Sequence, residues 1–329
     1  MARRERGFTL LELMISTAVM AVVIGYLFQT FSRQQRTYVV VDQVTEAQQN
    51  GRVVSDLLER DGRMAGYLTP KAAAVCAHDR TTAPDTLFVS DVDVLRRIDQ
   101  LRTANPDALA GNQGAPLTAA VGFVAGPNIS GLTLQRDWVD VAADGADFAT
   151  GRGVILVDVN DANGRVACGV IRSKAGNVLS VDFGPTSIGP IGSQASLMAV
   201  PAHVYAVTAG PPTQLQRDGL VLANDVEDLQ VALFTDINAN AAIDPGEFRG
   251  DGVAANYDAT GVDGDTLREV RVSVVIRTRE QDPNLGQGRR QTPENRALTV
   301  AETANDVANP GFRRRVHTAV VRLRNVGRG

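Results

Sequence analysis

The chain opens with two successive patterns of apolar residues, and both predict α-helix. Between Leu13 and Phe31 the sequence LMISTAVMAVVIGYLFQTF contains no charged residue. About 20 apolar residues at a rise of about 1.5 Å each span the hydrocarbon core of a bilayer. After Phe31 the apolar positions recur every three or four residues, as on one face of an amphipathic helix. These positions are Val40, Val44, Ala47, Gly51, Val54 and Leu58. The two patterns join without a break and predict one helix from Phe8 to Gly66, roughly 90 Å long.

Beyond Pro70 the helical period disappears, and short β-branched runs alternate with Gly, Pro, Asn and Asp. This alternation is typical of strands joined by turns. The predicted strands are 86–94, 153–160, 165–171, 177–184, 202–209, 229–236, 269–279 and 314–325, with hairpin turns at 160–164 and 174–177. Because the strands follow one another without strong helical segments between them, we expect an antiparallel sheet. The predicted fold class is α+β: a long amino-terminal helix packed on an antiparallel β-rich head.

These patterns divide the chain into four parts. The parts are a basic leader at 1–7, a membrane half of the helix at 8–31, an amphipathic half at 32–69 and a globular β-rich head at 70–329. Within the head, residues 97–114 and 281–301 are polar with few apolar anchors. We expect both segments to be mobile surface loops.

Composition and charge exclude several classes of protein. The chain is 44% apolar and 21% charged, which is ordinary for a globular protein, and its formal net charge is −4. A mildly acidic chain without a basic stripe does not bind nucleic acid. Neither a CxxC pair nor a cluster of histidines is present, so the sequence gives no indication of a zinc or redox site. Cys76 and Cys168 form one disulfide or remain two thiols, because the Cα separation that decides between them is not encoded in the spacing.

Glu12 places a carboxylate at the start of the apolar run, directly behind a leader with three arginines. An ionised carboxylate in hydrocarbon costs at least about 2.5 kcal/mol and usually has a partner. Cleavage between Gly7 and Phe8 would provide one, a free amine four residues before Glu12. The arginines favour a cytoplasmic start with the carboxyl side across the membrane. A secretory signal peptide removed after the run fits poorly, because the apolar run continues into a second helix. An ordinary signal anchor leaves Glu12 unexplained.

A basic leader that ends in Gly, followed by Phe-Thr-Leu-Leu-Glu and an unbroken apolar helix, resembles the class III signal of type IV pilins and pseudopilins. The resemblance implies that prepilin peptidase cuts after Gly7 and methylates the new amine of Phe8, and that Glu12 guides assembly. It also implies partners: other minor and major pilins, and the assembly platform of the inner membrane. The precursor would be a single-pass inner-membrane protein with a periplasmic head, and the assembled subunit would lie in a pilus, or fimbrium, at the cell surface.

Parts of the head are similar to one branch of this family, the PilW-type minor pilins. The segments concerned are QQNGRVVSDLLERDGRMAGY (48–67), LQRDGLVLANDVEDLQVALFTDINAN (215–240), REVRVSVVIRTRE (268–280) and RRRVHTAVVRLRN (313–325). In ALFTDIN the sequence departs from the branch, which more often has a Tyr-Gly pair there. The resemblance implies a minor pilin in the priming or tip complex of a type IV pilus.

Two other functions remain open from the sequence. A type II secretion pseudopilin is the alternative, although a head spanning 70–329 is long for that branch. A membrane-anchored periplasmic enzyme is more remote. The sequence contains no Ser-His-Asp pattern, HExxH, P-loop or GxSxG motif, so no catalytic residue is assigned and the chain is not expected to be an enzyme.

The twelve residues DINANAAIDPGE have the spacing of a calcium loop. Oxygen-bearing side chains occupy positions 1, 3, 5, 9 and 12, and a backbone carbonyl stands at position 7. These residues are Asp236, Asn238, Asn240, Asp244 and Glu247, with Ala242 giving the carbonyl. Against calcium, position 6 is Ala241 where an EF-hand has Gly, and no flanking helix pair is predicted. An Asn/Asp-rich turn without metal is therefore equally open. A calcium ion here would be structural, and no other cofactor is indicated.

Overall fold

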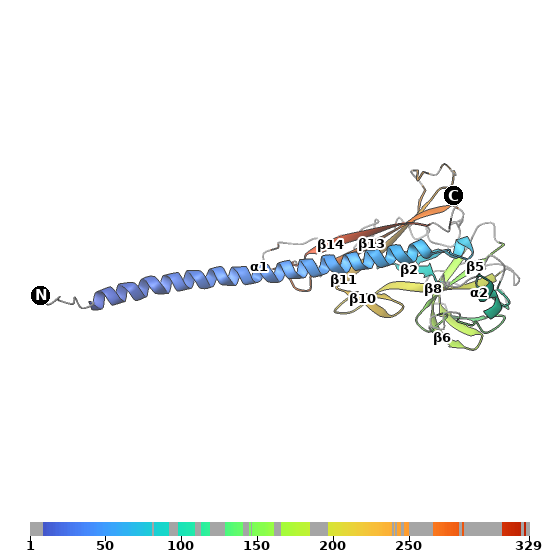
Figure 1. The fold of residues 1–329 in the computed structure, drawn as a ribbon, viewed down its shortest axis with the longest axis horizontal. Coiled ribbons are helices and arrows are strands. Elements are labelled where there is room, and N and C mark those ends of the chain that lie inside the picture. The colour runs from blue at the N-terminus through green and yellow to red at the C-terminus, as the bar shows by residue number, and fades with distance from the viewer. Residues whose placement is uncertain are drawn as a thin grey trace. The chain divides into compact units, whose positions relative to one another are not determined.

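The computed structural model describes residues 9–80, 82–91, 98–108, 113–118, 129–140, 145, 147–160, 166–184, 197–238, 240, 242–244, 247–249, 266–282, 285, 311–323 and 326 (Figure 1). Gly7 and Phe8 lie outside this range. The chain divides into two compact units, residues 1–46 and 47–329.

Helix α1 runs from Leu10 to Met64 without interruption, as the two joined apolar patterns predict. Its end is set by Gly66, which has φ +76°, a left-handed conformation that glycine adopts without steric cost. The amide of Gly66 donates to Ser90 Oγ at 2.9 Å, so the hydrogen bond that would have continued the helix goes to the head instead. The predicted terminus at Gly66 is therefore confirmed.

The head contains two antiparallel sheets, as Figure 1 shows. In the first sheet the strand order is β1-β2-β8-β5-β6-β7-β4, with β3 and β9 also paired to β8 and β10 paired to β9. Its strands are β1 (Val75–His78), β2 (Thr86–Ser90), β3 (Ala115–Pro116), β4 (Ile129–Thr133), β5 (Gly153–Asp158), β6 (Val166–Ala175), β7 (Val178–Asp182), β8 (Leu197–Thr208), β9 (Gln214–Arg217) and β10 (Leu220–Asn224). The second sheet has the order β12-β11-β13-β14. Its strands are β11 (Val226–Thr235), β12 (Phe248–Arg249), β13 (Leu267–Arg277) and β14 (Arg314–Arg322). Together with α1 these sheets confirm the α+β class.

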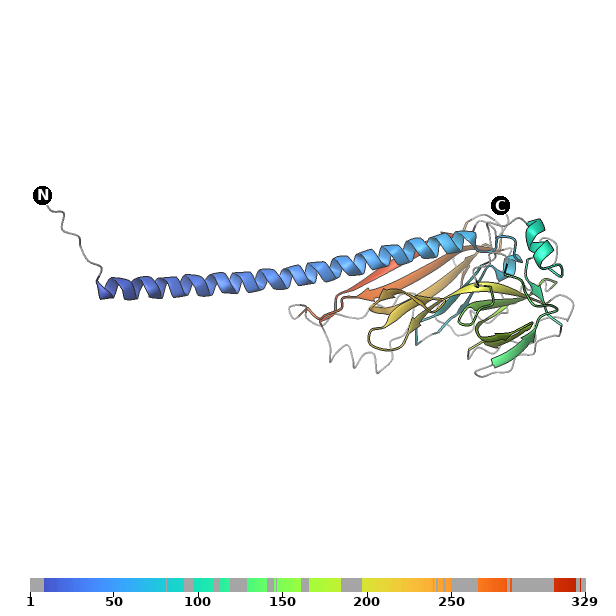
Figure 2. The ribbon, with the colours of Figure 1, turned by 60° about the horizontal axis from the view of Figure 1, so that its bottom comes forward.

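Residues 47–64 of α1 pack on the second sheet through the apolar stripe seen in the sequence (Figure 2). Val54 and Leu58 are buried in one core cluster with residues of β11, β13 and β14. Two glycines allow the helix to approach β14 closely, because a Cβ at Gly62 would lie 2.6 Å from Val321 Cγ1 and one at Gly51 would overlap the His317 ring. Glycine at these positions is therefore a packing requirement, not a point of helix weakness.

Asp85, just before β2, connects the two sheets. Its amide donates to Leu229 O and its Oδ2 accepts from Val231 N, both at 2.8 Å, so it pairs with β11 as a short strand would. Burial raises the pKa of Asp85 to about 8, although the amides of Arg80 and Val231 oppose that change. The backbone hydrogen bonds of β11 are thus satisfied from both sheets near this point.

Two expectations for loops meet different outcomes. Residues 97–114 were expected to form a polar loop, but α2 (Ile98–Ala104) forms within them. Leu101 explains the helix, because its side chain is buried in the core and anchors a short turn that otherwise looks solvated. Most of the segment 281–301 lies outside the described residues. The hairpin of β9 and β10 was not predicted, although Asp218 and Gly219, at φ +54° and +81°, are the Asp-Gly pair typical of a two-residue hairpin turn.

Candidate functional site

The amino-terminal end of α1 carries Glu12, the predicted assembly residue, whereas the predicted processing residues Gly7 and Phe8 lie outside the described residues. Glu12 Oε2 lies 3.4 Å from both the amide and the hydroxyl of Thr9, which donate to it, and Thr9 Oγ1 accepts from the Glu12 amide at 3.3 Å. This reciprocal pattern is a capping box, which satisfies amides at the start of a helix. Its Thr-x-x-Glu spacing is visible in the sequence, in addition to the charge of Glu12.

The first part of α1 exposes a continuous apolar surface. Large apolar side chains from Leu10 to Phe31 are more than half exposed in the described unit. The helix is long and apolar enough to cross a membrane, by length and composition. An apolar surface of this extent has to be covered by lipid or by other protein chains.

The loop after β11 brings together the side chains of the proposed calcium set. Asp236 is fully buried, and its Oδ2 accepts from Arg268 Nε and Nη2 at 3.2 Å each. The side-chain Nδ2 groups of Asn238 and Asn240 donate to the same oxygen, Asp244 Oδ2, at 2.8 Å each. Three members of the calcium set, Asn238, Asn240 and Asp244, are therefore joined by hydrogen bonds between their own side chains.

The remaining oxygens of the loop bind backbone amides. Glu247 accepts from the amides of Ile237 and Asp244, at 2.9 and 2.7 Å. Asn240 Oδ1 accepts from the amide of Ala242, whose carbonyl was the proposed seventh-position ligand. Among the residues described, no group of three or more His, Cys, Asp or Glu side chains is placed to hold a metal. The loop is closed by internal hydrogen bonds in this arrangement, and calcium stays a prediction.

Cys76 and Cys168 form a disulfide between β1 and β6, with a Cα separation of 6.2 Å. Both sulfurs lie in a buried apolar cluster with Phe88 and Ile155. His78, two residues after Cys76, donates from Nε2 to the carbonyl of Cys168 at 2.8 Å, and burial lowers the pKa of His78. A neutral imidazole thus adds a second connection between the same two strands.

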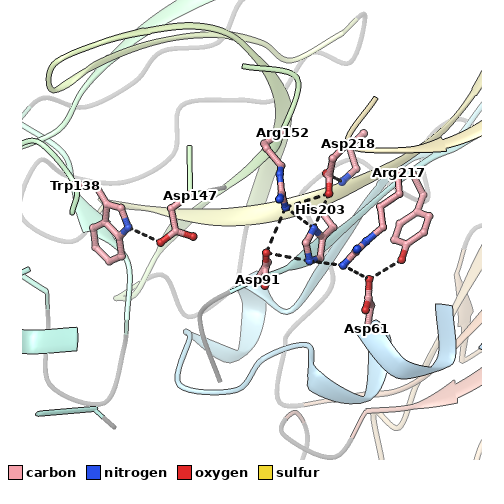
Figure 3. Close-up of polar contacts among 10 residues, drawn as sticks. Asp61, Asp91, Trp138, Asp147, Arg152, His203, Arg217 and Asp218 are labelled. Carbon is pink, nitrogen blue, oxygen red and sulfur yellow. Dashed lines mark hydrogen bonds and ion pairs between the residues drawn. The ribbon is translucent and has the colours of Figure 1, made fainter. Parts of the chain in front are cut away.

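A buried polar cluster, which the sequence argument did not find, connects the end of α1 to the first sheet (Figure 3). Asp61, near the carboxyl end of α1, is buried, with 8% of its surface exposed. Its Oδ2 accepts from the Tyr205 hydroxyl at 2.6 Å and lies 2.7 Å from Arg217 Nη2. Asp61 follows Leu58 by three positions, so it occupies the apolar stripe. An acid on that stripe was the signal available in the sequence.

His203 lies at the centre of the second half of this cluster, between two carboxylates (Figure 3). Its Nδ1 lies 2.7 Å from Asp218 Oδ2 and its Nε2 lies 2.9 Å from Asp91 Oδ2. Burial by itself lowers the pKa of His203, but the hydrogen bonds and charges of Asp218 and Asp91 outweigh it, so the pKa is raised. Arg152 Nη1 and Arg217 Nη2 also lie beside the ring, at 2.7 Å from Nδ1 and 2.6 Å from Nε2.

The cluster is balanced in charge when His203 is protonated. Three carboxylates (Asp61, Asp91 and Asp218) then face two guanidinium groups and one imidazolium. Buried ionic groups are tolerated when each has a partner of opposite charge. The arrangement includes no serine, cysteine or lysine nucleophile among its members. Because Asp61 on α1 contacts Arg217 and Tyr205 of the first sheet, we assign the cluster a structural role: it fixes the end of α1 to the head.

Replacing His203 by Gln is expected to change how stability depends on pH. Because the folded pKa is raised above 6.5, the stabilisation by protonated His203 is complete below pH 6.5 and is lost as the pH rises through the folded pKa. The difference in unfolding free energy between wild type and variant should therefore shrink above pH 6.5, as measured by urea titration of the full-length protein in detergent.

His317→Gln serves as the control for this measurement. Burial, Arg315 and Arg52 lower the pKa of His317, so its contribution changes only below pH 6.5. A difference between wild type and His203→Gln that stays constant, or grows, above pH 6.5 would contradict the account of His203.

Comparisons with known proteins point to the amino-terminal segment. Residues 2–28 match the family model described as the prokaryotic N-terminal methylation motif. No curated protein matches the chain. Among solved structures, the chain is similar to the type IV-like pilin TTHA1219 from Thermus thermophilus, with 10% sequence identity, coverage of 88% of this chain and 97% of that chain, and a TM-score of 0.28. A TM-score this low does not establish a shared fold. The motif matches the amino-terminal segment alone, and it is consistent with the likeness of this segment to the type IV pilins and pseudopilins.

Proposed function

We propose that this chain is a minor pilin of a type IV pilus, of the PilW type, that joins the priming or tip complex. Prepilin peptidase would cleave the precursor after Gly7 and methylate Phe8. Before assembly, α1 would hold the subunit in the inner membrane as a single pass with the head in the periplasm. The observation that carries the proposal is the methylation motif at residues 2–28 on a helix whose apolar surface is exposed.

Assembly would exchange lipid for protein around the same helix. The exposed apolar side chains of Leu10–Phe31 are suited to either environment, because both exclude water. Glu12 would limit the exchange to subunits that present a cation at the matching depth, and a cleaved amine at Phe8 is such a cation. The head would contribute contacts to other minor pilins at the tip.

The mature amino terminus tests the proposal. Mass spectrometry of protein from the native membrane should show a chain that begins at a methylated Phe8. Gly7→Ala is the matched variant, expected to leave the full-length precursor uncut. A native chain that begins at Met1, or beyond Phe31, would exclude a pilin.

Glu12 needs variants that separate its charge from its capping role. Glu12→Gln keeps the capping box, since Gln also occupies that position in capping boxes, but removes the charge. Thr9→Ala removes the cap and keeps the charge. We expect Glu12→Gln to be processed and to join sheared pili at less than a tenth of the wild-type amount, while Thr9→Ala assembles. The reverse order would assign Glu12 to capping alone.

A type II secretion pseudopilin is the second candidate, and the methylation motif fits it equally well. Deleting the chain separates the two. Loss of surface pili with normal secretion supports the minor pilin, whereas normal pili with lost secretion would assign the chain to the secretion machine.

A structural calcium ion in the loop from Asp236 to Glu247 is a further part of the proposal, supported by the spacing of the oxygen-bearing residues in the sequence. Calcium should raise the melting temperature of the full-length protein relative to chelator, and Asn240→Ala should abolish that rise. Asn240 is a better choice than Asp236, because Asp236 also pairs with Arg268 and its loss would destabilise the head without any metal. Equal melting temperatures with calcium and chelator would end the metal proposal.

A further inference from the structure

A cavity of about 330 Å³ lies in the head beside α2. It is open to solvent on one side and is lined by the end of α2, the turn that follows it, β3 and residues 136–139. Figures 1 and 2 place α2 near the end of the head at which α1 terminates. The volume falls at the lower end of the range for small-ligand sites, about 300 to 1,000 Å³.

The walls of the cavity are held by specific hydrogen bonds. The Asn105 side chain bonds to both backbone groups of Val139, accepting from N at 2.8 Å and donating to O at 3.1 Å. Trp138 donates from its indole nitrogen to Asp147 Oδ2 at 2.9 Å (Figure 3). Phe148 packs edge-on against the indole, with ring centroids 5.7 Å apart. A site that is already formed binds without the cost of ordering its walls.

The lining combines paired charges with a small apolar floor. Arg136 forms an ion pair with Asp107, and Asp137 lies 3.2 Å from Lys174 Nζ. The side chains of Arg136 and Asp137 are 69% and 62% exposed, so their polar groups remain accessible at the mouth. Ala108, Ala115 and Trp138 are each at most 5% exposed and form the buried apolar part.

These features define the class of ligand. Every charge named at the cavity has a partner of opposite sign, so the site has no excess charge to attract a strongly anionic or cationic molecule. A carboxylate accepts hydrogen bonds and a guanidinium donates them, and a hydroxyl group can satisfy both. A ring with hydroxyls on its edge and C–H groups on its face matches such a mouth and floor.

We propose that this cavity binds a neutral saccharide of one or two rings. Asp107 and Arg136 would bind hydroxyl groups, and the floor beside Trp138 would contact the C–H face. The inference does not depend on the proposed function, because a sugar site on the head can exist in a pilin or in a pseudopilin.

The protein contains one tryptophan, which provides a direct probe of the cavity. Trp138 fluorescence would be followed while full-length protein, in a detergent without a sugar headgroup, is titrated with methyl glycosides of neutral hexoses and N-acetylhexosamines. We expect a saturable change with at least one glycoside, and at least a tenfold weaker affinity in Arg136→Ala and Asp107→Asn.

Arg172→Ala is the matched control, since Arg172 forms an exposed ion pair with Asp182 outside the cavity. It should leave the affinity unchanged. A panel that gives no saturable change would overturn the proposal, as would an affinity that Arg136→Ala and Arg172→Ala alter equally. Tighter binding of glucuronic or sialic acid methyl glycosides than of every neutral one would overturn the neutral class.

Discussion

A Cys76→Ala, Cys168→Ala double variant is expected to lose about 4–5 kcal/mol of unfolding free energy, the largest effect anticipated for the head. The two residues are 92 positions apart, and in the chain-entropy model a cross-link of that length removes about this much free energy from the unfolded ensemble. Alanine is the appropriate replacement because both cysteines are buried among apolar side chains. Urea titration of the full-length protein in detergent, without reductant, measures the loss.

The single variants provide the control. Cys76→Ala and Cys168→Ala each remove the cross-link, so each should lose nearly as much as the double variant. Wild type titrated with reductant should approach the same value. A loss below about 1 kcal/mol in the double variant would show that the disulfide contributes little, contrary to the entropic account.

Local patterns predicted the helix and the main strands because those elements depend on neighbouring residues. The stripe that contains Val54 and Leu58 placed the buried face of α1, and the β-branched runs marked β5, β11, β13 and β14. The short helix α2 escaped prediction because one buried side chain, Leu101, anchors it. A single apolar residue is too weak a periodic signal to predict a helix.

The contacts between polar groups of the head could not be predicted from local sequence patterns, because they join segments that are far apart in the sequence. Cys76 and Cys168 were visible as a pair, but their bond depends on how β1 lies against β6, which no local pattern specifies. The contact of His203 with Asp91 and Asp218 likewise joins segments that only the sheet brings together. Three signals were readable and went unused: the Thr9–Glu12 capping spacing, Asp61 on an apolar stripe, and the Asp218-Gly219 pair at the β9–β10 turn.

Asp61→Ala is expected to lower the unfolding free energy by about 3 kcal/mol. Removing one member of a buried ion pair costs about 3–5 kcal/mol, because the remaining charge is left buried without a partner. The lower end of this range applies here, since the Arg217 side chain is 27% exposed and its charge can contact water when Asp61 is removed. The Tyr205 hydroxyl also loses its 2.6 Å acceptor. Urea titration measures the loss, with the exposed helix residue Asp56→Ala as the control, expected to change stability by less than about 0.5 kcal/mol.

A double-mutant cycle with Arg217→Met separates a buried charge pair from simple loss of packing. We expect the loss of Asp61 to destabilise the protein mainly because the charge of Arg217 is left buried without a partner. In that case the double variant should lose less unfolding free energy than the sum of the two single variants, by at least about 1 kcal/mol. Met keeps the length and apolar stem of Arg217, so packing is largely preserved. Additive losses would mean that Asp61 acts through Tyr205 or through the helix alone. Because Asp61 belongs to α1 and Arg217 to β9, a positive coupling would also show that this pair is part of what docks the helix end on the head.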